Sequence, residues 1–430
     1  MNILTISLNA WDDTQATGNT FSNFFESKDN DLVFSNIYCR NEPFDNHICT
    51  NYYRVTESDI INSIRTGNPV CGNVINSFSK SVNHEKKNKQ TYSLKDWIFH
   101  KFRPSALLFL REFLWLTNRW MTPELNQFLK DVSPDVIYMH GHNNRYMHNL
   151  LWYCQRMTGA KVVVFFGDDM YGIKSYRLGQ LIYHQWLRKK LKYTIEHADM
   201  LLGGSENLCV EYENKFNKIF YPQYKTCKTI LPPNIINEKG ELSIVYAGNL
   251  LYGRKELLMR FSELLHRVNK ENSTKIKLHI YSASPISEKE RIILDDGDNC
   301  VFEGARPYRV ICEILNKCDA SLFLESFDKQ NIRQTRLSFS TKIIDYMQSS
   351  SSLIVYGPHE IASVQYLEFS KSVLVAHNDD ELLEVLREIQ KNPCVLNEYA
   401  SKKYNFALKN HSTSTLIPRI KNLVQTDFSN

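Results

Sequence analysis

The segment "LSIVYAGNLLYGRKELL" (residues 242–258) indicates how the chain is built. Its first half is a continuous apolar run, which is typical of a strand buried on both faces of a parallel sheet. Its second half opens a helical pattern, "RKELLMRFSELLHRV" (254–268). A buried strand followed by a helix is the repeating unit of right-handed βαβ folds. The segment therefore predicts an α/β protein with a parallel sheet.

The same unit recurs along the whole chain. Two prolines and a glycine mark a polar stretch (231–243) that is typical of a linker. We predict two doubly wound, Rossmann-like domains that face a cleft, 1–235 and 241–410, with a C-terminal helix in 411–430 that packs back on the first. Ligands of such sheets bind at the carboxyl ends of the strands. The expected strands are 2–8, 31–39, 135–141, 161–167 and 200–205 before the linker, and 242–249, 276–282, 300–305, 320–326, 352–358 and 372–377 after it.

Composition and charge narrow the class of protein. With 430 residues, 43% of them hydrophobic and 23% charged, the chain has the composition of two or three folded domains. A net charge of +5 is too small to indicate a nucleic-acid partner. The ten cysteines show no CxxC or zinc spacing, no stretch reaches the ~18 apolar residues that span a bilayer, and the start does not resemble a signal peptide. We expect a reduced, cytoplasmic protein without a metal site.

Basic residues open two helices of the second domain, where the helix dipole disfavours them unless an anion is bound. Lys342 stands in the first turn of "RLSFSTKIIDYM" (336–347), and Arg254 and Lys255 open the helix of the first segment. A guanidinium fork and an ammonium group are a common pair on phosphates, so we predict one shared anion. The alternative is that Arg254 and Lys255 are solvated, with Glu256 beside them.

Asp345 lies one turn after Lys342, on the same face of the expected helix. We interpret it as a carboxylate that accepts hydrogen bonds from two ribose hydroxyls. A phosphate at the helix start and a diol one turn later describe a nucleotide. The alternative is an exposed ion pair between the two residues.

Polar residues also end two strands of the first domain. His140 and His142 follow one strand, and Asp168 and Asp169 follow the next along the chain. Because strand ends meet at one edge of a parallel sheet, we expect an imidazole and two carboxylates on the rim of the cleft. The alternative is that they are packed or capping residues. Neither set has metal-ligand spacing, and the chain has no GxSxG elbow or phosphate-binding GxxxxGK[ST] loop.

Apart from roughly residues 60–130, the chain resembles the nucleotide-sugar glycosyltransferases of the GT-B fold. The likeness is greatest to the retaining family that includes many bacterial polysaccharide enzymes (glycosyltransferase family 4, group 1 type). The similar segments are "HADMLLGGSENL" (197–208), "ILPPNI" (230–235), "IVYAGNLLYGRKELL" (244–258), "CDASLFLESFD" (318–328) and "RLSFSTKIIDYMQSSSSLIVYGP" (336–358).

The resemblance implies roles for individual residues. The loop after the first strand of the second domain and the later helix start would hold the donor diphosphate, and an acid in that helix would hold the ribose. A strand-end histidine of the first domain would touch the donor sugar. The implied donor-binding residues are Gly248, Asn249, Arg254, Arg336, Ser340, Thr341, Lys342 and Asp345. Of the catalytic residues that we predict, His140 matches the family's strand-end histidine, Asp168 (or Asp169) is predicted from its place at a strand end, and Glu325 is a candidate replacement for a family glutamate.

Some positions depart from the family pattern. The family usually has two glutamates with seven residues between them. Asp345 matches the second, whereas Leu337, eight positions earlier, stands in place of the first. Glu325 can replace that glutamate only if the intervening loop folds back, and Arg336 is another candidate for the same space. The usual SGxP after the helix reads "SSSS" (349–352), and the N-terminal loop has one glycine, Gly18, where the family often has two.

Residues 66–130 form an insertion of different composition. Within 80–103, seven basic residues stand against two acidic ones, and "ALLFLREFLWLTNRWM" (106–121) follows. Basic charge next to an aromatic amphipathic helix is the composition of a membrane-surface element, in which Trp115 and Trp120 would insert. The alternative is an ordinary helix whose aromatic side chains belong to the core.

Together these features predict a glycosyltransferase that moves a sugar from a nucleoside-diphosphate sugar to a hydroxyl acceptor, a glycan or a lipid-linked sugar, in bacterial surface polysaccharide synthesis. It would need no cofactor or metal and would be cytoplasmic, with peripheral binding to the anionic inner face of the membrane through 80–121. One rival is a nucleotide-sugar 2-epimerase of the same fold. The other is a sugar-nucleotide-binding scaffold without catalytic activity, which the missing first glutamate keeps open.

Overall fold

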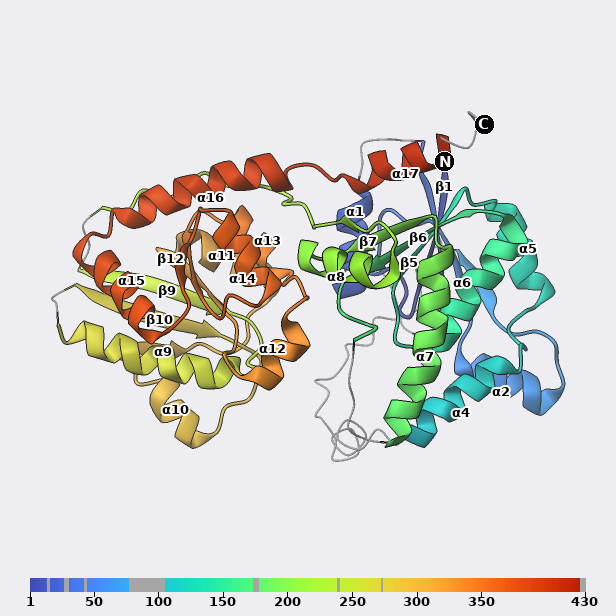
Figure 1. Ribbon diagram of the computed structural model, residues 1–430, viewed down its shortest axis with the longest axis horizontal. Coiled ribbons are helices and arrows are strands. Elements are labelled where there is room, and N and C mark those ends of the chain that lie inside the picture. The colour runs from blue at the N-terminus through green and yellow to red at the C-terminus, as the bar shows by residue number, and fades with distance from the viewer. Residues whose placement is uncertain are drawn as a thin grey trace. The chain divides into compact units, whose positions relative to one another are not determined.

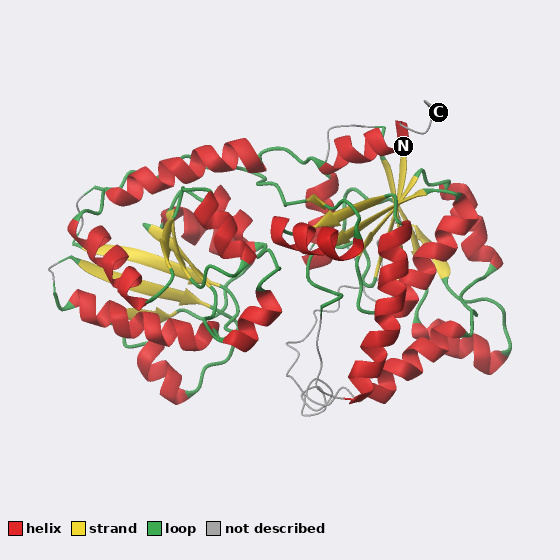
Figure 2. Cartoon of the chain, viewed as in Figure 1, coloured by secondary structure: helices red, strands yellow, loops and turns green. Residues whose placement is uncertain are grey.

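The computed structural model describes residues 1–13, 16–26, 31–41, 45–76, 105–172, 178–237, 240–271 and 274–425. They fold into two compact units, Met1–Gln223 with Thr415–Asn430, and Tyr224–Ser414, each with a central sheet covered by helices (Figures 1 and 2). The predicted α/β class with two Rossmann-like domains is confirmed. The segment 224–235, which the linker pattern places in the first domain, belongs to the second unit, because the backbone N–H groups of Cys227 and Leu231 donate to carbonyls of that unit.

The sheet of the first unit has the strand order β4-β3-β2-β1-β5-β6-β7-β8. All neighbouring strands are parallel except β4, which runs antiparallel to β3. Three strands, β3, β4 and β8, lack the apolar runs that mark the others, because they are short and lie toward the sheet's edges. The strands are β1 (Asn2–Ser7), β2 (Val33–Tyr38), β3 (Asn51–Arg54), β4 (Asn73–Asn76), β5 (Val136–His140), β6 (Lys161–Phe166), β7 (Met200–Gly203) and β8 (Tyr221–Pro222).

Helices cover this sheet, and the last helix of the chain is one of them. Leu416, Ile417 and Ile420 of that helix, α17, enter the same core as Ile3 and Phe21, so the chain's end packs against α1. The helices of the first unit are α1 (Ala16–Phe25), α2 (Glu57–Thr66), α4 (Ser105–Leu116), α5 (Pro123–Val132), α6 (Arg145–Thr158), α7 (Leu178–His197), α8 (Glu206–Phe216) and α17 (Leu416–Gln425).

The sheet of the second unit is parallel throughout, in the order β11-β10-β9-β12-β13-β14. Every strand predicted after the linker is present. The strands are β9 (Glu241–Ala247), β10 (Lys275–Tyr281), β11 (Cys300–Phe302), β12 (Ala320–Leu324), β13 (Ser352–Tyr356) and β14 (Leu374–Ala376). The helices are α9 (Arg254–Asn269), α10 (Glu288–Leu294), α11 (Tyr308–Lys317), α12 (Lys329–Thr335), α13 (Lys342–Gln348), α14 (Ala362–Phe369), α15 (Asp379–Lys391) and α16 (Val395–His411).

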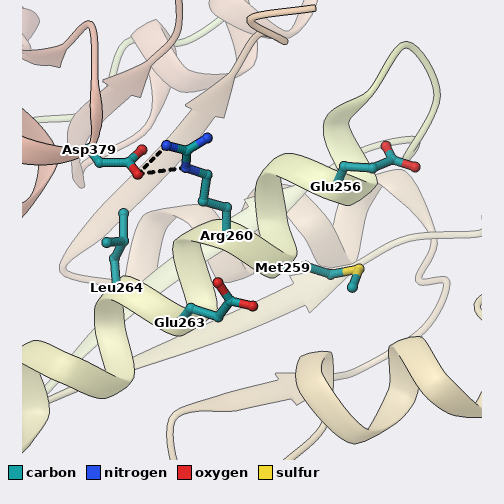
Figure 3. Close-up of a pocket in the computed structure, with 6 residues that line it drawn as sticks. All are labelled: Glu256, Met259, Arg260, Glu263, Leu264 and Asp379. Atoms are coloured by element: carbon teal, nitrogen blue, oxygen red, sulfur yellow. Dashed lines mark hydrogen bonds and ion pairs between the residues drawn. The ribbon is translucent and has the colours of Figure 1, made fainter.

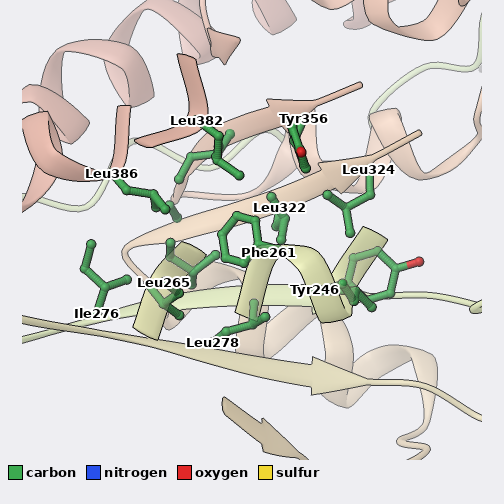
Figure 4. Packing of buried hydrophobic residues seen from close by; sticks show 14 of the residues in the cluster. Tyr246, Phe261, Leu265, Ile276, Leu278, Leu322, Leu324, Tyr356, Leu382 and Leu386 are labelled. Carbon is green, nitrogen blue, oxygen red and sulfur yellow. The ribbon is translucent and has the colours of Figure 1, made fainter. Parts of the chain in front are cut away.

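Two apolar layers hold the helices of this unit on their sheet. On one face, Phe261 and Leu265 of α9 and Leu386 of α15 pack on strand residues such as Leu278 and Leu322 (Figure 4). The other face is covered by α11, α13, α14 and α16 through a second buried cluster. Each fully buried side chain of this size contributes about 1.5–3 kcal/mol. The burial of both faces explains why these strands are continuous apolar runs.

Both sheets have a topological switch point, where the strand order reverses, and ligands of such sheets bind beyond the carboxyl ends of the strands at that point. In the first unit it lies between β1 and β5, and in the second between β9 and β12. In the second unit, α9, which follows β9, covers one face of the sheet, and α13, which follows β12 after α12, covers the other. The segments that follow these two strands are therefore where a ligand site is expected.

The predicted membrane insertion of Trp115 and Trp120 is wrong. These side chains are 2% and 1% exposed. Trp115 stacks on Tyr146 of α6 at 4.3 Å between ring centroids, and Trp120 donates through Nε1 to the carbonyl of Trp115 at 2.9 Å. They belong to the core because α4 and the turn after it face α6. The basic run 80–103 lies outside the described residues.

Candidate functional site

The site of the second unit begins at the end of β9, where Gly248 allows a side chain to cross the strand end. A Cβ at Gly248 would lie 1.7 Å from Nζ of Lys342. Farther along the same loop, Gly253 has a left-handed backbone (φ 74°), and a Cβ there would lie 2.4 Å from Oγ of Ser326 after β12. Two glycines thus allow the loop that precedes α9 to approach both α13 and the end of β12.

Arg254, the first residue of α9, connects the ends of β9 and β12. Its Nη2 donates to Oε1 of Glu325 at 2.8 Å, its Nη1 to Oδ1 of Asn249 at 3.1 Å, and its Nε to the carbonyl of Leu324 at 3.2 Å. The side chain is only 11% exposed, so the alternative that Arg254 is a solvated cation is wrong. Its neighbour Lys255 has a partner elsewhere, an ion pair with Glu290 at 2.6 Å.

Glu325 is buried at the switch point and half of its carboxylate is unsatisfied. It is 3% exposed, and its Oε2 has no hydrogen-bond partner among the residues that the structure describes. Burial raises the pKa of this carboxyl, and the charge and hydrogen bond of Arg254 oppose that rise. A buried polar atom without a hydrogen-bond partner lowers the stability of the folded state, so a ligand donor that binds it removes that cost.

Lys342 places an ammonium group beside this pair. Its Nζ lies 5.5 Å from the centroid of the Tyr246 ring and forms no hydrogen bond or ion pair within the described part of the chain. Burial, with the charge of Arg254, lowers its pKa to about 8, although Glu325 and Asp345 act in the opposite direction. An unpaired, partly buried cation has an electrostatic preference for an anion at this place.

Asp345 lies farther along α13 and does not pair with Lys342. Its Oδ1 accepts a hydrogen bond from the hydroxyl of Tyr308, the first residue of α11, at 2.7 Å. Burial raises the pKa of Asp345, and the Tyr308 hydroxyl, Lys225 and Lys342 lower it. The alternative of an exposed Lys342–Asp345 ion pair is therefore wrong.

The loop before α13 is held by a residue that the sequence patterns did not single out. Oγ of Ser363 accepts from the backbone N–H of Ser340 at 2.9 Å and donates to the carbonyl of Ser338 at 3.1 Å. The carbonyl of Arg336 accepts from the N–H of Ala362, and the Thr341 side chain makes no capping bond to α13. Nothing in the local sequence marks Ser363 for this role.

The chain between Glu325 and Lys342 does fold back, as a substitution of the missing glutamate by Glu325 requires. It forms α12, and the charge of Glu325 acts on Lys342. Leu337 is buried and belongs to the core, which explains an apolar residue at that position. At the other end of α13, Lys403 is completely buried and donates through Nζ to the carbonyls of Tyr346 and Ser349.

In the first unit, His140 ends β5 and packs edge-on against Phe21 of α1, with 4.7 Å between ring centroids. Asp168, after β6, is exposed. Asp169 has a structural partner, because its Oδ1 accepts from the hydroxyl of Tyr212 at 2.9 Å. Burial, with nearby arginine charges, lowers the pKa of His142 to about 4, so this imidazole is neutral.

The loop after β1 in this unit holds a polar group that the motifs did not reveal. Asp13 accepts from Nδ2 of Asn46 at 2.8 Å and pairs with Nδ1 of His47 at 3.0 Å. A Cβ at Gly18 would lie 2.1 Å from the carbonyl oxygen of Asp12, so this glycine lets α1 pack against the loop.

A separate hollow lies along the outer side of α9 (Figure 3). Arg260 donates through Nε to Oδ2 of Asp379 across it, at 2.6 Å. It contains none of the predicted site residues, and its arginine is already paired with Asp379, so we do not assign a ligand to it. Its lining residues are Glu256, Met259, Arg260, Glu263, Leu264 and Asp379.

The solved structures compared below share the fold and are distant in sequence. No family model matches the chain, and no curated protein is similar to it by sequence. Anabaena HepE in complex with UDP has a TM-score of 0.57 at 9% identity and covers 100% of both chains. The E. coli structure described as trehalose-6-phosphate bound with UDP-2-fluoro glucose has a TM-score of 0.58 at 11% sequence identity, and the match covers 99% of both chains. Sucrose-phosphate synthase from Thermosynechococcus elongatus has a TM-score of 0.55 at 11% sequence identity, and the match also covers 99% of both chains. The fold of this chain is therefore the GT-B fold of these glycosyltransferases.

Proposed function

We propose that this protein is a glycosyltransferase that transfers a sugar from a nucleoside-diphosphate sugar to a hydroxyl acceptor, with retention at the anomeric carbon, in the synthesis of a bacterial surface glycan. The observation that carries the proposal is the group at the switch point of the second unit: Lys342, without an ionic partner, beside the buried pair of Arg254 and Glu325. UDP or a UDP-sugar analogue is bound in two of the similar structures.

The ammonium of Lys342 would bind the donor diphosphate. Its Nζ occupies the space over the end of β9 that Gly248 leaves open, because a Cβ at Gly248 would lie 1.7 Å from it. As the bond from the sugar to the diphosphate breaks, negative charge grows on the leaving group. A preorganised cation stabilises that charge best in a site from which water is largely excluded. With Arg254 as a second positive charge, we propose that no metal is needed here.

Asp345 would bind the ribose. Tyr308 holds one of its oxygens, so the carboxylate is oriented and can accept from the ribose hydroxyls with the other. Lys225 and Lys342 favour the charged form of this carboxyl against its burial, and a charged acceptor forms the stronger hydrogen bonds.

Glu325 would bind the donor sugar. Arg254 holds Oε1, and the unsatisfied Oε2 is suited to accept from a sugar hydroxyl. In this role Glu325 replaces the glutamate that is absent at Leu337. From the first unit, we propose that His140 contacts the donor sugar and that the exposed Asp168 serves the acceptor hydroxyl.

We also propose a cytoplasmic protein that binds peripherally to an anionic membrane surface. No described helix is long and apolar enough to cross a membrane. Support comes from α4 and α7, which pack together and leave Leu110, Phe113, Leu178 and Ile182 exposed. The basic run that precedes α4 in the sequence would add attraction to anionic lipids.

Product analysis tests the function. The protein is incubated with a panel of nucleoside-diphosphate sugars, with and without glycan or lipid-linked acceptors, and the released nucleotide and the products are measured by mass spectrometry. We expect a glycosylated acceptor for one donor, lost in Lys342→Met and retained in Lys255→Met, because Lys255 is paired with Glu290. A rearranged sugar without any acceptor would instead indicate a 2-epimerase, and donor binding without turnover would indicate a scaffold.

A further inference from the structure

A second cluster of chemically active side chains lies at the ends of β13 and β14, outside the donor site. His359 follows β13, Glu368 belongs to α14, and His377 follows β14. Oε2 of Glu368 lies 2.8 Å from Nδ1 of His359, and Oε1 lies 3.3 Å from Nε2 of His377. One ligand atom from each residue lies within 4.8 Å of the others, although nothing in the spacing of the sequence marks the three.

The hydrogen bonds of His377 show that a positive charge belongs between it and Glu368. Its Nδ1 lies 3.0 Å from the carbonyl oxygen of Gly357, which can only accept, so Nδ1 carries a hydrogen. In a neutral ring, Nε2 then presents a lone pair, and that lone pair faces a carboxylate oxygen. Two electron pairs at this distance repel each other unless a second proton or a metal ion lies between them. The carboxylate of Glu381, which accepts from the backbone N–H of His377, adds further negative potential.

The set of ligands favours a transition metal. Two imidazoles and one carboxylate are a ligand set of zinc sites that keep a fourth position open. The contact of His377 with a backbone carbonyl is the usual outer-shell support of a metal-bound histidine. Calcium and magnesium prefer oxygen ligands only. We propose that His359, Glu368 and His377 bind a divalent transition metal ion, zinc in particular, with a fourth position open to water.

The geometry requires only local adjustment. In a tetrahedral site with metal–ligand distances of about 2.0–2.2 Å, ligand atoms lie roughly 3.3 Å apart, so the three groups need to close by about 1.5 Å at most. His359 is 64% exposed and can rotate toward the better fixed His377. The metal would link His359, two residues after Gly357, to His377, which contacts the Gly357 carbonyl, and so would stabilise the loop at Gly357. This loop lies against the donor site, because a Cβ at Gly357 would lie 3.1 Å from the Cβ of Glu325.

Zinc binding by the full chain, prepared without a histidine tag and stripped with EDTA, tests the site. Isothermal titration and elemental analysis should show one equivalent of Zn²⁺ with a Kd in the micromolar range or below, and neither Mg²⁺ nor Ca²⁺ should bind. Co²⁺ should give the visible absorption of a tetrahedral site. The measurements use a Cys394→Ser background, because this thiol is exposed.

Variants assign the ligands. His359→Gln, Glu368→Gln and His377→Gln should each raise the Kd for Zn²⁺ about tenfold or more and remove the zinc-induced rise in unfolding temperature. The matched control is His279→Gln, which breaks the pair of His279 and Glu303 (3.1 Å). This pair has no third metal ligand among the described residues, so the His279→Gln variant should bind zinc as the parent does. No binding tighter than 100 μM, or zinc affinity unchanged in His359→Gln and His377→Gln, would overturn the proposal, and neither result would bear on the proposed sugar transfer.

Discussion

Replacing Lys342 with methionine tests the diphosphate site most directly. Methionine keeps much of the apolar length of the side chain and removes the ammonium. Because Nζ has no hydrogen bond or ion pair with any residue that the structure describes, the change leaves no protein group without its partner. The loss in affinity is then the loss of the contact with the ligand. A hydrogen bond to a charged group contributes about 1.5–3 kcal/mol, so the Kd for UDP should rise about 10- to 150-fold.

The free protein should respond in the opposite direction. Burial lowers the pKa of Lys342 from its ordinary value of 10.5 to about 8, so the folded state disfavours the ammonium more than the unfolded chain does. Between pH 8 and 10.5 the unfolded chain binds more protons, so this residue makes the protein more stable as pH rises and less stable as pH falls through that window. The Lys342→Met variant lacks the cost of the buried charge, and its unfolding temperature at pH 7 should equal or exceed that of the parent.

The same pKa predicts how nucleotide binding depends on pH. Above pH 8 the free protein holds a growing fraction of neutral amine at Lys342, so UDP affinity should fall as pH rises. Titration calorimetry with UDP at pH 7 and pH 9, together with thermal unfolding, measures both effects. Lys255→Met is the matched control, because that lysine pairs with Glu290. A folded Lys342→Met variant that binds UDP within twofold of the parent at pH 7 would refute the reasoning.

Four further changes test other parts of the structure. Glu325→Gln leaves the buried Arg254 without a counter-charge and should lower the free energy of unfolding by about 3–5 kcal/mol in denaturant titrations, whereas Glu271→Gln, at an exposed ion pair, should change it little. Asp345→Asn should narrow the difference in affinity between UDP and 2′-deoxy-UDP, and an unchanged ratio would remove Asp345 from the ribose site. Lys403→Met leaves buried carbonyls at the end of α13 without a donor and should cost about 1–3 kcal/mol of stability, measured in the same titrations. Phe113→Gln should reduce sedimentation with anionic liposomes without lowering the unfolding temperature, and equal sedimentation would count against membrane contact through α4.

The sequence alone determined the architecture, for a physical reason. Strands of a parallel sheet are covered on both faces, so β9, β12 and β13 are recognisable as continuous apolar runs, and the helices between them follow from their own periodicity. The strands β3, β4 and β8 could not be found in this way, because short strands near a sheet edge need little apolar character. The charge of Lys342 at a helix start was also visible, because the helix dipole acts within the first turn.

The pairing of these residues was decided only by the tertiary structure. Arg254 meets Glu325 because β9 and β12 are neighbours in the sheet, and Tyr308 reaches Asp345 across two helices that are separate in the chain. Burial of Trp115 depended in the same way on a partner helix, since an aromatic helix has the same composition whether it faces a core or a membrane. His359 and His377 come together because β13 and β14 pair side by side. Periodicity along a chain reports which side of an element is buried, whereas contacts between distant residues depend on strand order, which no local pattern contains.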